Sequence, residues 1–136
     1  MSNTPWNARP GEALHIPSGP HVNQRHLFVI FYGPNGMPDY GPVRQLLLAS
    51  VTTIRPGIGH DPACVIQPGE HPFVNERSYI LYRDVRVVAE NHAQHMVATQ
   101  VWTPHSVPFS PELLAKVIAG AQTSKFMPRE FRQFVS

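Results

Sequence analysis

The sequence predicts a mainly β domain, a small β-barrel followed by a C-terminal helix. The apolar runs are about as long as strands and are rich in β-branched and aromatic residues, which is typical of strands rather than buried helices. Fifteen prolines among the 136 residues favour short strands and turns over long helices. A chain of this length supports one hydrophobic core, so we expect residues 1–136 to form a single domain.

Residues 1–103 alternate apolar runs with turns rich in proline and glycine. Residues 1–11 are polar and contain prolines, so we expect a loose arm before a barrel over residues 12–103. Glycine and proline dominate the segment 33–42, which predicts a loop. Residues 89–96 suit a short helix. The expected strands are 13–16, 26–31, 45–53, 63–66, 78–82 continued by 85–88 after a break at Arg83-Asp84, and 97–101.

The C-terminal segment 110–134 carries clear helix signals. Ser110 is a good N-cap, and Pro111 suits the first helical position. Apolar residues recur at helical spacing after this proline, and we expect Gly120 to end the helix. A second short helix is expected after Pro128, with its phenylalanines facing inward.

Five or six short strands followed by a helix suggest a compact SH3-like barrel with a terminal helix. The alternative all-β fold is a cupin-type barrel, which usually has more strands than this sequence offers. The expected fold is therefore the SH3-like barrel.

Charge and cysteine content narrow the function classes. The formal net charge is +2, which is a weaker basic signal than a dedicated duplex-DNA binder usually shows. The single cysteine, Cys64, excludes an intrachain disulfide and fits a reducing compartment. The first residues lack signal-peptide features, and no apolar run approaches the roughly 20 residues of a membrane span. We expect a soluble, cytoplasmic protein.

The stretch 25–53 places reactive residues at the ends of two apolar runs. Arg25 and His26 precede the first run, and Thr52 and Thr53 close the second. Two such runs separated by a turn-rich segment predict neighbouring core strands. Successive strand residues face opposite sides of a sheet, so only one of the two threonines can point into a site.

The order of these segments resembles the MazF/PemK family of bacterial toxins. The resemblance covers about residues 10–120. The family has Arg-Pro where this chain has Arg25-His26, and a shift of one residue in a strand turns a side chain to the other face. The segments that carry the resemblance are Pro10-Gly11-Glu12-Ala13-Leu14-His15-Ile16, Arg25-His26 before Leu27-Phe28-Val29-Ile30, Leu47-Leu48-Ala49-Ser50-Val51-Thr52-Thr53, and Ser78-Tyr79-Ile80-Leu81-Tyr82.

Members of that family are SH3-like barrels that act as metal-independent endoribonucleases and often dimerise. The resemblance places Arg25 or His26 at the family's arginine position and Thr52 at its threonine position. Cleavage of RNA through its 2′-hydroxyl needs a base, an acid and a cation that stabilises the phosphorane. Arginine suits the cation role because its fork matches phosphate oxygens, and histidine suits either proton-transfer role.

Further candidates lie in the turns and strands that follow. His60 beside Asp61 could be an oriented acid–base residue and a fourth catalytic candidate, although such a pair is often a polar turn with the aspartate as cap. Arg86 is expected to be exposed without a role. The candidate substrate-binding residues are Arg55, His71, Ser78 and Arg83.

Eight histidines raise the alternative of a metal site. His92 and His95 would share a helix face, and His15, His21 and His26 could approach from neighbouring strands. No HExxH motif and no cysteine pair is present. We therefore expect no metal and no cofactor.

The expected function is that of a toxin-like, metal-independent endoribonuclease acting on single-stranded RNA. Tyr32, Tyr40 and Trp102 are available for base stacking. The resemblance further implies an antitoxin partner, often an acidic segment that orders on binding, and a homodimer. The alternative is a non-catalytic SH3-like module that binds a protein or a nucleic acid, and a third option is a cupin-like metal enzyme.

Overall fold

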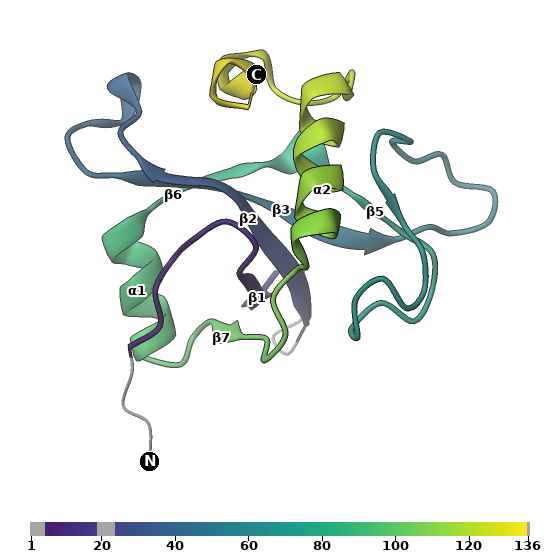
Figure 1. The fold of residues 1–136 in the computed structure, drawn as a ribbon, viewed down its shortest axis with the longest axis horizontal. Helices are drawn as coiled ribbons and strands as arrows, with labels where there is room; N and C mark the ends of the chain where they lie inside the picture. The colour runs from purple at the N-terminus through teal and green to yellow at the C-terminus, as the bar shows by residue number, and fades with distance from the viewer. Residues whose placement is uncertain (1–4, 19–23, 136) are drawn as a thin grey trace.

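The computed structural model describes residues 5–18 and 24–135, and its centre is an antiparallel sheet (Figure 1). The strands are β1 (Ala13–Pro17), β2 (Arg25–Asn35), β3 (Gln45–Thr53), β4 (Val65–Ile66), β5 (Ser78–Ile80), β6 (Arg86–Ala89) and β7 (Thr103–Pro104). The helices are the 3-10 helices η1 (Pro38–Tyr40), η2 (Tyr82–Asp84) and η3 (Arg129–Phe134) and the α-helices α1 (Glu90–Ala98) and α2 (Pro111–Thr123).

Strand β3 is the central strand of the sheet. The order is β4-β5-β3-β2-β1-β7, and the edge of β3 opposite β2 pairs with β6 through Gln45–Leu48 and with β5 through Val51–Thr53. The mainly β prediction is confirmed, but the sheet does not close into a barrel. The outermost strands, β4 and β7, do not pair with each other in the described residues. Each has only two residues, too short a ladder to close a barrel.

Alternation along the strands gives the sheet two buried faces. Leu27, Val29 and Phe31 of β2 face α2 and η3, and we call this side the α2 face. Phe28 and Ile30 face a second core that includes residues of α1, and we call this side the α1 face. Figure 1 shows the two α-helices beside different parts of the sheet. A sheet covered on both faces explains the nearly continuous apolar runs in β2 and β3.

Local sequence signals predicted several elements correctly. The strands expected at 13–16 and 45–53 and the helix expected at 89–96 are present with small changes at their ends. Ser110 is the N-cap of α2, since its Oγ accepts a hydrogen bond of 3.1 Å from the Leu113 backbone N–H.

Two expected boundaries are wrong. There is no strand at 97–101, because α1 continues to Ala98 and the chain then turns at Gln100 with a φ of 63°. Gly120 does not end its helix either: α2 continues to Thr123. A Cβ on this glycine would lie 2.8 Å from Cys64 Cβ, so Gly120 allows α2 to approach the sheet closely.

Further corrections concern strand length and the N-terminal arm. The loop expected from residue 33 begins later, because β2 runs to Asn35. Glycine at position 33 allows β2 to continue beside β3, because a Cβ there would clash with the Gln45 carbonyl oxygen. The single fifth strand is two strands, β5 and β6, separated by η2. Residues 5–11 are not loose: Ala8 is buried, and Trp6 packs against the second core.

No helix in the described residues is long and apolar enough to cross a membrane.

Candidate functional site

A polar hollow lies on the α1 face, at the end of β2 and β3 away from α1. Helix α1 packs near Ile30 and Leu48, whereas residues further along the same strand faces line a cavity of about 260 Å³. We call this cavity the His26 hollow. Its lining residues are Ser18, His26, Phe28, Ser50, Thr52, Leu81, Asp84 and Arg86.

Strand pairing brings these side chains together. Phe28 pairs with Ser50, and residues two positions along each strand, His26 and Thr52, face the same side. The neighbouring Thr53 faces the opposite side and lines a separate cavity of about 390 Å³. As the alternation rule predicts, only one of the two threonines reaches the hollow.

His26 has one ring nitrogen available in the hollow. Its side chain is half-buried, and its Nδ1 forms a hydrogen bond with the Ser18 hydroxyl. The Nε2 atom has no hydrogen-bond partner among the described residues. This arrangement orients the ring and leaves one nitrogen free for proton transfer.

Arg86 lies over an aromatic ring in the same hollow. Its Cζ atom is 4.4 Å from the centroid of Phe28, a cation–π contact that positions the guanidinium. No acidic side chain in the described segments forms an ion pair with it; Asp84, which also lines the hollow, is 3.8 Å from Arg83. The sequence prediction of an exposed Arg86 without a role missed this position. The available signal was a charged residue within the apolar run Val85-Arg86-Val87-Val88.

Arg25 lies outside the His26 hollow. It precedes His26 on β2, so its side chain faces the other side of the sheet. Its Nη1 donates a hydrogen bond of 3.3 Å to the Thr103 hydroxyl, and the side chain is exposed. Of the two candidates for the family's arginine position, the structure brings only His26 into the hollow.

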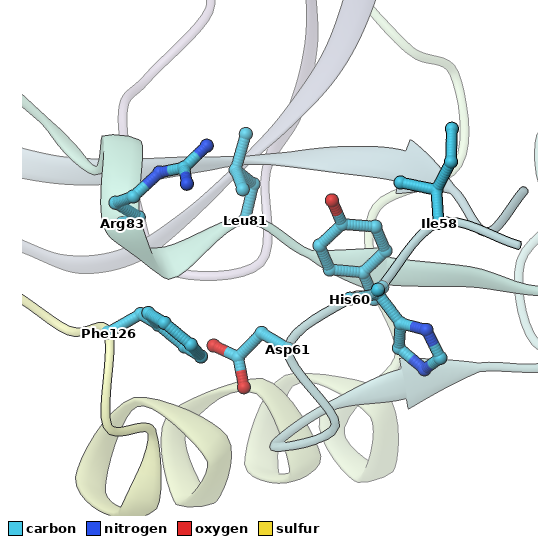
Figure 2. A pocket seen from close by; sticks show the side chains of 8 residues that line it. Ile58, His60, Asp61, Leu81, Arg83 and Phe126 are labelled. Atoms are coloured by element: carbon cyan, nitrogen blue, oxygen red, sulfur yellow. The ribbon is translucent and has the colours of Figure 1, made fainter.

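A second cavity adjoins the hollow. It has a volume of about 440 Å³, and Leu81 lines both spaces. Figure 2 shows Phe126 and Asp61 on one side of this cavity and Leu81 and Arg83 on the other. We call it the Phe126 cavity. Its lining residues are Ile58, Gly59, His60, Asp61, Tyr79, Leu81, Arg83 and Phe126, and so include two predicted site residues, His60 and Arg83.

His71 is buried in a structural role. Its Nδ1 accepts a hydrogen bond of 3.1 Å from the Phe73 backbone N–H, so its Nε2 carries the proton and donates to the Val107 carbonyl at 2.8 Å. Burial lowers the pKa of His71, and the nearby His105 lowers this pKa further. A neutral ring with both nitrogens occupied is not free to bind substrate, so the predicted substrate role of His71 is not supported.

The other two substrate-binding candidates lie elsewhere. Ser78 is buried, donates a hydrogen bond of 2.9 Å to the Glu76 carbonyl, and lines the cavity beside Thr53. Arg55 is exposed in the turn after β3 and lines neither the His26 hollow nor the Phe126 cavity.

The described histidines do not form a metal site. His15 and His71 both lie close to His105, with ring centroids 5.4 and 4.8 Å from it. Even so, no group of three or more His, Cys, Asp or Glu side chains in the described residues could hold a metal ion. His21, one of the predicted ligands, lies outside the described residues.

The predicted stacking aromatics do not line the hollow either. Trp102 is buried in the second core, Tyr32 packs near Phe134, and Tyr40 lies 6.2 Å from Phe131 between ring centroids. The aromatic residues in and next to the His26 hollow are instead Phe28, which lines it, and Tyr79 and Phe126 of the adjoining cavity.

Comparisons with known proteins identify no relative: no family model matches the chain, and neither the curated proteins nor the solved structures include a significant match.

Proposed function

We propose that this chain is a divergent toxin of MazF/PemK type, a metal-independent endoribonuclease that cleaves single-stranded RNA. The supporting observation is the His26 hollow, which combines an imidazole with a free nitrogen, an arginine without an acidic partner in the described residues, and the hydroxyls of Ser50 and Thr52. These are the group types that phosphodiester transesterification requires.

Each group has a defined role in the proposed reaction. His26 Nε2 removes the proton of the 2′-hydroxyl, and the 2′ oxygen attacks the adjacent phosphorus. Arg86 and the Thr52 hydroxyl stabilise the charged phosphorane. The bond to the 5′ oxygen then breaks, leaving a 2′,3′-cyclic phosphate. The leaving 5′ oxygen takes up a proton from water, because His60 lies beyond Leu81 in the adjoining Phe126 cavity.

The proposal includes an SH3-like fold and the partners that go with the resemblance. Two features support the fold: β3 pairs with β2 on one edge and with β5 and β6 on the other, and α2 follows the strands. An acidic antitoxin segment would cover Arg83 and Arg86 and so block the hollow. The homodimer remains part of this proposal.

One observation favours the alternative function, a non-catalytic binding module. Ile58 and Phe126 are 64 and 51 % exposed beside the Phe126 cavity, and exposed apolar side chains grouped at a cavity suit a partner surface. Such a module would bind its partner at the Phe126 cavity without cleaving RNA.

The decisive experiment is cleavage of a mixed-sequence single-stranded RNA with EDTA present. We expect the parent protein to cleave, and His26→Ala to lose about 10²–10⁴-fold in rate because the base is removed. Arg86→Ala is expected to lose about 10²–10³-fold, and Thr52→Val less. Arg25→Ala should retain the parent rate because its side chain lies outside the hollow.

Matched controls use the same substitutions at exposed positions outside the hollow. His95→Ala in α1 and Arg129→Ala in η3 should leave the rate unchanged. A folded parent that does not cleave would refute the ribonuclease and favour the binding module. Cleavage that survives His26→Ala and Arg86→Ala would show that the hollow is not the active site.

A further inference from the structure

The Phe126 cavity has walls held in place by a buried hydrogen-bond network. Ser124, 1 % exposed, donates a hydrogen bond of 2.5 Å to Asp61 Oδ2, and the Ala63 backbone N–H donates to Asp61 Oδ1 at 2.9 Å. The Ser124 Oγ also accepts a hydrogen bond of 3.0 Å from the Phe126 backbone N–H. The network joins the loop that carries His60 to the segment that carries Phe126, so the two walls are fixed relative to each other.

The lining presents aromatic faces beside a positive charge. The rings of His60 and Tyr79 lie 5.5 Å apart between centroids, and the Phe126 side chain is 51 % exposed. Arg83 lines the same cavity. Asp61 is buried and each of its carboxylate oxygens accepts a hydrogen bond, whereas the Arg83 side chain is exposed. Its Nε lies 3.8 Å from Asp84 in a surface ion pair, so an anionic ligand competes with Asp84 for this cation. This chemistry suits a planar ring attached to an anion.

Size and position agree with a nucleotide of a longer strand. A volume of about 440 Å³ falls in the range of small-molecule sites. Leu81 lines both the cavity and the His26 hollow, so the two spaces adjoin, as neighbouring nucleotides of one strand would require.

We propose that the Phe126 cavity is a nucleobase subsite, in which a base next to the cleaved phosphate stacks on Phe126. This inference rests on the proposed function for its substrate, single-stranded RNA. Stacking on an aromatic face tolerates different bases, so the subsite contributes affinity and strand position. Arg83 binds a phosphate of the same nucleotide.

The test is binding rather than cleavage. A short fluorescein-labelled 2′-O-methyl oligonucleotide cannot undergo 2′-hydroxyl attack, and its fluorescence anisotropy reports binding alone. We expect Phe126→Ala to weaken binding about tenfold or more, Phe126→Leu to weaken it similarly, and Phe126→Trp to retain it. Phe73→Ala is the matched control, because Phe73 is also exposed, at 42 %, and lies outside the cavity.

A second oligonucleotide carries abasic nucleotides in place of bases. The parent and Phe126→Ala should bind it equally, since there is no base to stack. The proposal is overturned if the parent binds no oligonucleotide, if Phe126→Ala binds like the parent, or if Phe126→Leu retains full affinity, which would indicate an apolar contact such as a peptide side chain.

The two proposals can fail separately. Phe126-dependent binding by a parent that does not cleave RNA would refute the ribonuclease and leave the subsite standing. Cleavage that depends on His26 together with binding that is independent of Phe126 would refute the subsite alone.

Discussion

Two regions of this molecule hold histidines in different surroundings. In the His26 hollow, the imidazole has one nitrogen without a partner among the described residues and shares the cavity with Arg86. In the group of His15, His71 and His105, which we call the His71 cluster, the rings pack on one another and on Phe73. His71 has both ring nitrogens hydrogen-bonded, whereas His26 has one nitrogen without a partner among the described residues, and this difference makes His26 the candidate for chemistry.

The His71 cluster fastens two segments that are far apart in the sequence. His71 follows β4 and donates to the carbonyl of Val107, which follows β7. His105 accepts a hydrogen bond of 3.0 Å at its Nδ1 from the Val107 backbone N–H. The two imidazoles thus form hydrogen bonds to the backbone of a segment that belongs to no helix or strand.

The largest expected effect on stability comes from removing His71. His71→Ala leaves a cavity at a buried side chain and removes the hydrogen-bond partners of the Val107 carbonyl and the Phe73 N–H, so the free energy of unfolding should fall by about 2–4 kcal/mol. His26→Ala, in the open hollow, should change it by less than about 1 kcal/mol. Urea unfolding followed by circular dichroism measures both.

If the free energy of unfolding falls equally in the two variants, His26 contributes as much to stability as His71, and the contrast between the two regions is wrong. A loss of RNA cleavage in His26→Ala counts as catalytic only when its unfolding midpoint stays close to that of the parent.

The Asp61–Ser124 pair extends the comparison to a buried carboxylate. Ser124→Ala removes the donor to Asp61 Oδ2 and the acceptor of the Phe126 N–H. We expect a loss of about 1–3 kcal/mol in the free energy of unfolding. The exposed Ser106→Ala serves as the control and should unfold like the parent. An unchanged stability in Ser124→Ala would mean that water replaces the hydroxyl and that the cavity wall is not held by this network.

The parts of the fold that follow from neighbouring residues could be predicted from the sequence. The cap at Ser110 depends on a donor three residues away, and the opposite orientations of Thr52 and Thr53 follow from strand alternation alone. The strand at 45–53 could be predicted because a short apolar run between two turn-rich segments is typical of a buried strand.

The rest depends on contacts between distant segments. His71 finds its partner 36 residues away, so nothing beside it in the sequence indicates a structural role. Arg86 reaches the hollow because β6 pairs with Leu46 and Leu48 of β3, a register that the sequence does not specify. Gly120 has the usual signal of a helix end, but the side chains of Cys64 and Tyr82 require a glycine there for close packing. Tertiary packing overrode the local signal.

The smallest expected effect is a pH dependence of stability that arises in the His71 cluster. Burial lowers the pKa of His71 and of His15, and His105 lowers both further, with Arg25 adding to the effect at His15. The unfolded chain therefore binds more protons than the folded chain as the pH falls below about 6.5. Stability contributed by the neutral rings is fully present above that pH and is lost as the pH falls toward the lowered pKa values.

Urea unfolding at a series of pH values from neutral to mildly acidic measures this dependence. We expect the free energy of unfolding to decrease toward acid in the parent and to decrease less steeply in His71→Gln, which cannot take up a proton. The exposed Ser106→Ala, which removes no titratable group, should leave the slope unchanged. If His71→Gln loses stability toward acid as steeply as the parent, the cluster is not the acid-sensitive part of the fold.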